Sequence, residues 1–302
     1  AYAEAMTGFA AQGYLDVWNQ LVTVDDLRTS AGITYEEFVK RIDRFERRAR
    51  RKDSRQAVGK MTESVEGRHR ILNQPPVLFP LRALTGEYDP TSVEAEAHAA
   101  LAAYKSTLYD ALQFLLDRYT IVDVGVKVVG VGSVGTRCLI ILLQGKDDSD
   151  MFFLQAKEAQ ASVLEEFLTP SPYGNHGQRI VEGQRLSQAQ SDIFLGWTTG
   201  RIGQRDFYVR QLRDWKGSVE IEGATPRQLS FYADLCGRTL ARGHARTGDP
   251  DAIAAYIGGG KKLARAIGSF SEAYAAQNLD DYERFHAAIE SGRLPTTGNA
   301  DR

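Results

Sequence analysis

The chain has 302 residues, and 37 Lys and Arg stand against 39 Asp and Glu, so the formal net charge is −2. With 43% hydrophobic residues, the composition is that of a soluble globular protein and excludes disorder as the general state. The near-neutral charge provides no overall field for nucleic acid or an anionic membrane. No run of 18 or more uninterrupted apolar residues occurs, so no membrane partner is expected.

The two cysteines, Cys138 and Cys236, lie far apart and match neither a disulfide framework nor a metal-ligand spacing. Their scarcity favours a reducing, cytoplasmic location. The chain opens at Ala1 without a basic or cleavage-like tract, so no targeting segment is expected.

Residues 1–118 are predicted to be a helical segment. Thr34 to Glu37 form a capping box for one helix, and Thr91 to Glu94 form a second. The second helix is expected to run to about Arg118, and its apolar stripe consists of Leu101, Tyr104, Leu108, Leu112 and Leu115.

The sequence between these helices, residues 67–84, contains three prolines and no period, which predicts an irregular connection. From Thr120 the pattern changes to short β-branched runs separated by turn residues, which predicts a small antiparallel sheet. A helix at about residues 177–191 interrupts the strands. The five predicted strands are residues 121–131, 138–143, 151–159, 192–197 and 206–212.

Helices return after Pro226 and continue to about Ser291. The predicted class is therefore α+β, with a five-stranded β-lobe and one partner helix. In this division residues 1–118 and 215–302 contribute to a helical lobe, and residues 119–214 form the β-lobe.

Gly130-Val-Gly132-Ser133-Val-Gly135 is a G-x-G-x-x-G motif shared by two phosphate-binding devices. In a dinucleotide-binding unit the last glycine opens a helix. Here Thr-Arg-Cys-Leu-Ile-Ile-Leu-Leu and Gly145 follow, a run too short and apolar for an amphipathic helix. Strand, glycine loop and strand is the arrangement of the kinase glycine-rich loop, where backbone N–H groups close over nucleotide phosphates.

The kinase interpretation requires a lysine on the next strand, and Lys157 in MFFLQAKEA meets this requirement. Its carboxylate partner should come from the following helix. Glu182 is the first candidate, because it aligns with Leu186, Ala189 and Ile193 on an apolar stripe, and Glu165 is the second. The strand that ends at Leu212 would lead to the hinge that binds adenine.

Simpler interpretations exist for each residue. A glycine-rich hairpin is often only a tight turn or bulge, Lys157 alone is more often a solvated edge lysine, and Glu182 alone is more often a surface residue. The basic run RRARRK between Arg47 and Lys52 is interpreted as a solvated helix face, so nucleic acid is disfavoured as a partner.

Five long segments carry a strong resemblance to the domain of unknown function 2252 family. They are VVGVGSVGTRCLIILLQG, FLQAKEAQASVLE, GQRIVEGQRLSQAQSDIFLGW, RDFYVRQLRDWKGS and LARGHARTGD. The family resembles a branch of the protein-kinase-like superfamily, related in style to aminoglycoside and small-molecule kinases. The resemblance implies a phosphate loop of Gly130, Gly132, Ser133 and Gly135, with Lys157 as phosphate lysine and Glu182 as its partner.

The family pattern also has a Gly-Asp-x-His-x-x-Asn-Phe-Gly segment and an Asn-Asp-Phe-Asp-Glu segment, which resemble a catalytic loop and a metal-binding aspartate. Neither occurs in these 302 residues. The nearest look-alike, His244-Ala-Arg-Thr-Gly-Asp249, is interpreted as the end of a helix. The catalytic base and magnesium ligands are therefore expected outside this chain.

The leading hypothesis is a kinase-like phosphotransferase domain that binds ATP and magnesium and acts on an unidentified small-molecule substrate. A non-catalytic nucleotide-binding or regulatory module of the pseudokinase type is the alternative. A dinucleotide-dependent oxidoreductase is the third hypothesis, and it would require a helix directly after Gly135.

Overall fold

The computed structural model describes residues 1–21, 54–83, 90–128, 130, 135–200, 204–212 and 221–295. The chain divides into two compact units, one formed by Ala1–Trp18 with Tyr232–Arg302 and the other by Asn19–Phe231. The second unit contains both sheets, and we call it the sheet unit. Helices and antiparallel sheets together confirm the α+β class. The predicted helix start at Thr34 and the basic run near Arg47 lie outside the described residues.

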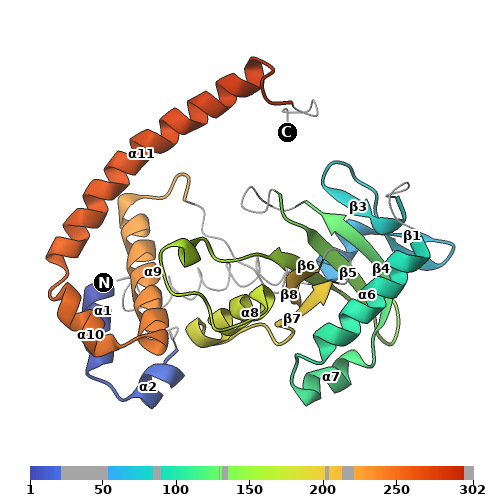
Figure 1. Ribbon diagram of the computed structural model, residues 1–302, viewed down its shortest axis with the longest axis horizontal. Helices are drawn as coiled ribbons and strands as arrows, with labels where there is room; N and C mark the ends of the chain where they lie inside the picture. The colour runs from blue at the N-terminus through green and yellow to red at the C-terminus, as the bar shows by residue number, and fades with distance from the viewer. Residues whose placement is uncertain are drawn as a thin grey trace. The chain divides into compact units, whose positions relative to one another are not determined.

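A six-stranded sheet is the centre of the sheet unit (Figure 1), with strand order β3-β4-β5-β6-β8-β7. Every neighbouring pair is antiparallel. The five-strand prediction is therefore wrong by one edge strand. The strands are β3 (Leu78–Pro80), β4 (Thr120–Lys127), β5 (Cys138–Gln144), β6 (Met151–Ala159), β7 (Gly196–Gly200) and β8 (Arg205–Gln211).

The additional strand β3 comes from the proline-containing segment that was predicted to be irregular. Proline is compatible with an edge strand, because one side of that strand has no neighbour and a missing N–H on that side costs no hydrogen bond of the sheet. Pro80 ends β3 opposite Gly125 of β4. A second correction lies just before it, because β1 (Thr62–Val65) and β2 (Arg68–Ile71) form a hairpin where a helical segment and the start of the irregular connection were predicted. Its two turn residues, Glu66 and Gly67, both have positive φ, as tight hairpin turns require.

In the sheet unit the helix predicted at about residues 177–191 ends at Ser187, and the helix predicted from Thr91 is divided in two. The helix expected to run from Thr91 to Arg118 ends at Lys105 and a new one starts at Asp110. The Thr107 hydroxyl donates to Tyr104 O at 2.7 Å and accepts from Trp197 N at 3.1 Å, so it joins the break to the edge strand β7. The helices are α5 (Ser54–Met61), α6 (Pro90–Lys105), α7 (Asp110–Leu116) and α8 (His176–Ser187), with 3₁₀ turns at Leu81–Ala83 and Val163–Glu166.

Strand β7 begins four residues later than the predicted start at Asp192. The Asp192 carboxylate accepts hydrogen bonds from Phe194 N at 2.9 Å and Gln211 N at 2.6 Å, which holds residues 192–195 in a turn. This local side-chain bonding competes with strand formation.

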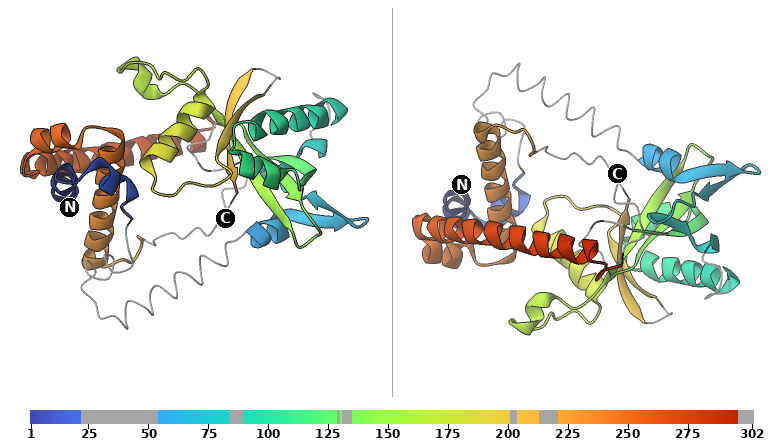
Figure 2. Two further views of the ribbon diagram at one scale, coloured as in Figure 1. Left: turned by 90° about the horizontal axis from the view of Figure 1, so that it is seen from below. Right: turned by 90° about the horizontal axis from the view of Figure 1, so that it is seen from above.

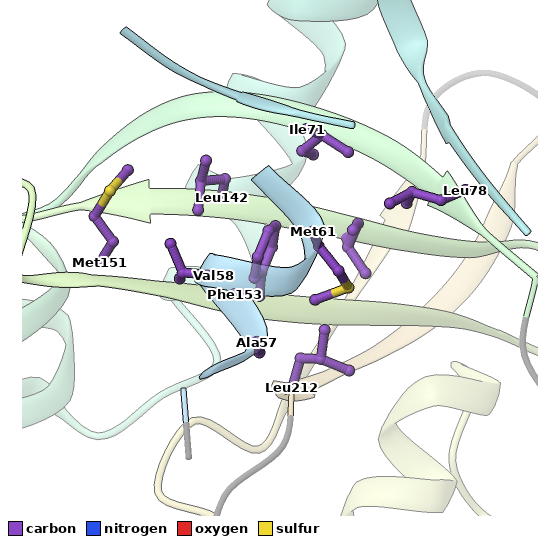
Figure 3. Close-up of a cluster of buried hydrophobic side chains, with 10 residues drawn as sticks. Ala57, Val58, Met61, Ile71, Leu78, Leu142, Met151, Phe153 and Leu212 are labelled. Carbon is purple, nitrogen blue, oxygen red and sulfur yellow. The ribbon is translucent and has the colours of Figure 1, made fainter. Parts of the chain in front are cut away.

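Two hydrophobic cores lie on opposite faces of the sheet. On one face, Ala57, Val58 and Met61 of α5 pack against Phe153 of β6, as Figure 3 shows. We call this the α5 face. The opposite face, the α6 face, is covered by Tyr104 and residues of α6 and α7 (Figure 2). The predicted stripe lies in this second core, where Tyr104 and Leu108 are buried and Leu101, Leu112 and Leu115 are partly buried.

The other unit is helical. Its core consists of Met6, Phe9 and Val17, packed against Ala241 and Ala245. No helix in the described part of the chain has the length and apolarity needed to cross a membrane. The helices are α1 (Tyr2–Ala10), α2 (Tyr14–Asn19), α9 (Pro226–Thr247), α10 (Pro250–Ile257) and α11 (Lys261–Glu290), and the first residues of α9 and the last of α2 belong to the sheet unit.

Truncation of a side chain in the core on the α5 face should lower the stability of the sheet unit strongly. Phe153 is fully buried between α5 and the sheet, so Phe153→Ala should lower the free energy of unfolding of the sheet unit by about 3–5 kcal/mol. Phe167, which is 80% exposed, offers a matched control. Phe167→Ala should change it by less than about 0.5 kcal/mol. Urea denaturation followed by circular dichroism measures both, and equal losses would contradict the assignment of this core.

Candidate functional site

The glycine motif lies in the connection between β4 and β5, which pair antiparallel. Gly130 has φ 28° and Gly135 has φ 82°, and an added Cβ at either position would meet no atom within 4 Å. Backbone conformation rather than crowding therefore favours glycine at these two positions. Gly132 and Ser133 lie outside the described residues.

A strand, not a helix, follows the motif, since β5 begins at Cys138. This confirms the predicted strand after Gly135. The dinucleotide oxidoreductase hypothesis requires a helix that starts at the last glycine, and the strand β5 contradicts that requirement.

Lys157 lies on β6, the strand next to β5. Eight of the nine β6 residues are buried, and Lys157 is the exception. Cys138 of β5 lies directly opposite Lys157 on one side and Tyr208 of β8 on the other, so the three residues share the α5 face. Lys157 therefore lies on a central strand, which contradicts its interpretation as an edge lysine.

Further basic side chains surround this row. Arg210 of β8 lies opposite Gln155, one step along the same face. Burial raises the pKa of the Cys138 thiol, and the charges of Lys157, Lys127 and Arg210 act in the opposite direction. We call Lys127, Lys157 and Arg210 the basic cluster.

Two members of the basic cluster, Lys157 and Arg210, lack a carboxylate partner in the part of the chain that the structure describes. No ion pair of Lys157 or Arg210 occurs within the described ranges. The Arg210 Nε atom is buried, and it has no hydrogen-bond partner among those residues. A buried donor without a partner costs about 1–3 kcal/mol, so an anion at this position would be stabilised.

The partner predicted for Lys157 has a different contact. The Glu182 carboxylate accepts from Arg185 at 3.0 Å, and the second candidate, Glu165, lies 3.9 Å from Arg179. The inward stripe proposed for Glu182 is wrong, since α8 ends at Ser187, before Ala189 and Ile193, and Leu186 is 40% exposed. The side of α8 that is buried consists of Gly177 and Val181.

Two predicted features remain, the HARTGD segment and the proposed adenine hinge. His244 lies in the last turn of α9, where its Nδ1 is 2.7 Å from the Tyr2 hydroxyl, and Asp249 caps α10 by accepting from Ala252 N at 3.0 Å. These contacts agree with the interpretation of HARTGD as a helix end. The proposed adenine hinge after Leu212 lies outside the described residues.

Sequence reasoning found Lys157 but missed Arg210, Cys138 and Tyr208. The alternation of side chains along a strand predicts which residues of that strand share a face. It does not predict the register between strands, which places residues of β5, β6 and β8 beside one another. Together these side chains can bind an anion by charge and hydrogen bonding. No group of three or more His, Cys, Asp or Glu side chains suited to a metal lies in the ranges that the structure covers, so we assign no magnesium ligand to them.

Glu158, next to Lys157 on β6, faces the other way and is buried. Its carboxylate accepts from Arg137 at 3.2 Å and from Arg205 at 2.8 Å. Burial alone would raise the pKa of this carboxyl, but the hydrogen bonds from Arg137, Gln160 and Arg205 outweigh it and lower the pKa below its ordinary value. Glu158 therefore anchors the loop that leads from the glycine motif into β5.

Glu158→Gln should reduce the free energy of unfolding by roughly 1–3 kcal/mol at pH 7, because charge-assisted hydrogen bonds are lost. A lowered folded-state pKa gives stability that is present above the unfolded pKa of about 4.3 and is lost as the pH falls through the folded value. The difference between variant and wild type should accordingly shrink in that acid range. Asp280→Asn, which removes an exposed pair on α11, is the control and should change stability by under about 0.5 kcal/mol. A difference for Glu158→Gln that stays constant with pH would contradict this role.

Comparison with known proteins shows the family of the chain. A family model described as an uncharacterised protein conserved in bacteria, domain of unknown function 2252 (DUF2252), matches residues 1–288. No curated protein and no solved structure gives a significant match to the chain. Since the family model covers nearly the whole length, the chain belongs to the domain of unknown function 2252 family.

Proposed function

We propose that the sheet unit is a kinase-like, ATP-binding module. The observation that carries the proposal is the position of Lys157 on the central strand next to the glycine hairpin and beside Arg210, where neither of these two cations has an ion pair among the described residues. In kinases a glycine-rich loop covers the phosphates and a lysine on the next strand binds phosphate oxygens. The triphosphate of ATP would bring negative charge to Lys157 and Arg210.

The order of elements supports the same proposal. The hairpin β4–β5, the lysine strand β6, the helix α8 and the strands β7 and β8 follow one another along the chain. Helix α8 lies over β7 and β8 on the side opposite α6 (Figure 2), which is the α5 face and the side of Lys157. Glu182 therefore belongs to the element expected to carry the lysine's partner, although it is paired with Arg185 here.

The chemistry proposed for the active protein is phosphoryl transfer to a small molecule. Such transfer depends on positioning and electrostatic stabilisation, with a residue that orients the acceptor and carboxylates that hold magnesium. The motifs expected for these tasks do not occur in the 302 residues. The described residues can contribute phosphate binding and orientation of the nucleotide, and we derive no step through the metal.

A regulatory nucleotide-binding module of the pseudokinase type is the second candidate. It requires the same basic cluster and glycine hairpin but no catalytic residues. Binding of ATP alone would therefore not distinguish the two candidates, whereas turnover would.

ATP with magnesium should raise the melting temperature of the protein. Ligand at 100 times its dissociation constant stabilises by about 2.7 kcal/mol. Lys157→Met should weaken binding about tenfold or more, because hydrogen bonds to charged groups are worth about 1.5–3 kcal/mol. Differential scanning fluorimetry over a range of ATP concentrations measures both proteins.

The matched control is Lys146→Met, which removes an exposed lysine from the turn between β5 and β6. It should leave the ATP-dependent shift unchanged. No shift for wild type up to millimolar ATP, or equal shifts for wild type and Lys157→Met, would exclude the proposed site. Glu182→Gln should reduce the shift only if Glu182 leaves Arg185 and meets Lys157 when nucleotide binds.

These 302 residues should show no kinase or ATPase turnover above background, because the two motifs expected to orient the acceptor and to hold magnesium do not occur in the sequence. A protein that also carries the family's Gly-Asp-x-His segment should be active if the kinase-like proposal is right, and inactive if the pseudokinase proposal is right. Phosphate release in a coupled assay measures this. Turnover of the present chain that disappears with Asp249→Asn would show that HARTGD is catalytic after all.

A further inference from the structure

The sheet unit contains a large cavity on the α6 face, opposite the side of Lys157. Its volume is about 960 Å³, and it lies between α6, the β1–β2 hairpin and the six-stranded sheet. Small-molecule sites in proteins have volumes of about 300–1,000 Å³. The cavity is therefore large enough for a ligand and is separated from the basic cluster by the sheet itself.

Helix α6 packs mainly over β7 and covers β4 and β5 less, so the apolar side chains of β4 and β5 form the floor of the cavity. Val126, Leu139 and Ile141 line the floor and stay partly exposed, and Ala97 and Leu101 of α6 line the opposite wall. Transfer of such surface out of water is favourable by about 25 cal/mol per Å². The lining therefore favours a ligand with an aliphatic body.

Positive charge gathers where the β1–β2 hairpin borders the cavity. Arg68, Arg70 and Arg82 line this border, together with the carboxylates of Asp123 and Asp148. Asp123 is paired with Arg82, whereas no ion pair of Arg68 or Arg70 occurs among the residues that the structure describes. Asp148 lies 3.8 Å from His69. Among the side chains that line this border, guanidinium groups outnumber carboxylates, with Glu63 opposite Arg70 on the neighbouring strand, and this favours an anionic head group over a cationic one.

We propose that this cavity binds a small amphipathic anion, an aliphatic chain that ends in a carboxylate. The chain would lie on the floor formed by β4 and β5, and the carboxylate would meet Arg68 and Arg70. The site would work independently of the proposed ATP site. Leu154 and Ala156 of β6 line the cavity, whereas Lys157 lies on the other face.

Dodecanoate below its micelle concentration is the probe, titrated into the full 302-residue chain by isothermal titration calorimetry. Saturable binding with one site per chain is expected. Dodecyltrimethylammonium, which has the same chain and the opposite charge, should bind at least about tenfold more weakly, a difference of about 1.4 kcal/mol. Absence of saturable dodecanoate binding, or equal binding of the two probes, would overturn the proposal.

Two variants locate the binding site. Ala97→Phe places a ring in the cavity from α6 and should lower dodecanoate affinity about tenfold or more, whereas Ala103→Phe, on an exposed position of the same helix, should not. The charge test is the double variant Arg68→Gln, Arg70→Gln, with Arg265→Gln on α11 as its control. The double variant should reduce dodecanoate affinity and leave the affinity for 1-dodecanol unchanged.

The outcomes separate this site from the proposed ATP site. Lys157→Met should leave dodecanoate binding unchanged, because Lys157 lies across the sheet. Should Ala97→Phe fail to fold, the arginine variant still decides the question, since those side chains are at the border and not in the core. Dodecanoate affinity that is the same in wild type, in Ala97→Phe and in the arginine variant would overturn the assignment to this cavity.

Discussion

Strand β6 determines most of what surrounds it, because it is hydrogen-bonded on both sides and its side chains alternate between two covered faces. Phe153 goes into the core under α5 and Leu154 into the core under α6. Each of these faces needs its own helices. A shift of the β6 register by one residue would move the side chains of each face to the other face, and Lys157 would then lie on the side where Glu158 is buried.

The two faces differ in how much of the sheet their helices cover. On the α5 face, the helix covers the end with Phe153 and Leu212 and leaves Lys157 partly exposed. On the α6 face, helix α6 leaves part of β4 and β5 uncovered, which creates the cavity. Both candidate sites thus arise from the same cause, a sheet that is larger than the helices packed on it.

The sequence predicted the strands with strong apolar runs nearly to the residue. The run MFFLQAKEA coincides with β6, and CLIILL lies within β5. Prediction failed where side-chain hydrogen bonds or tertiary contacts decide, as at Thr107, which ends α6, and Asp192, which delays β7. It also failed at Pro80, because a proline near a strand is tolerated at a sheet edge that only the tertiary structure defines.

For the candidate site, sequence reasoning could identify Lys157 but not the charges beside it. Arg210 lies over fifty residues further along the chain and meets the same face only through the register of β6 with β8. The buried Nε of Arg210 has no acceptor among the described residues, which is costly in free energy. An anionic ligand at this position would supply an acceptor for that nitrogen. The carboxylate of Glu158, which faces the other side of the same strand, is by contrast paired with Arg137 and Arg205.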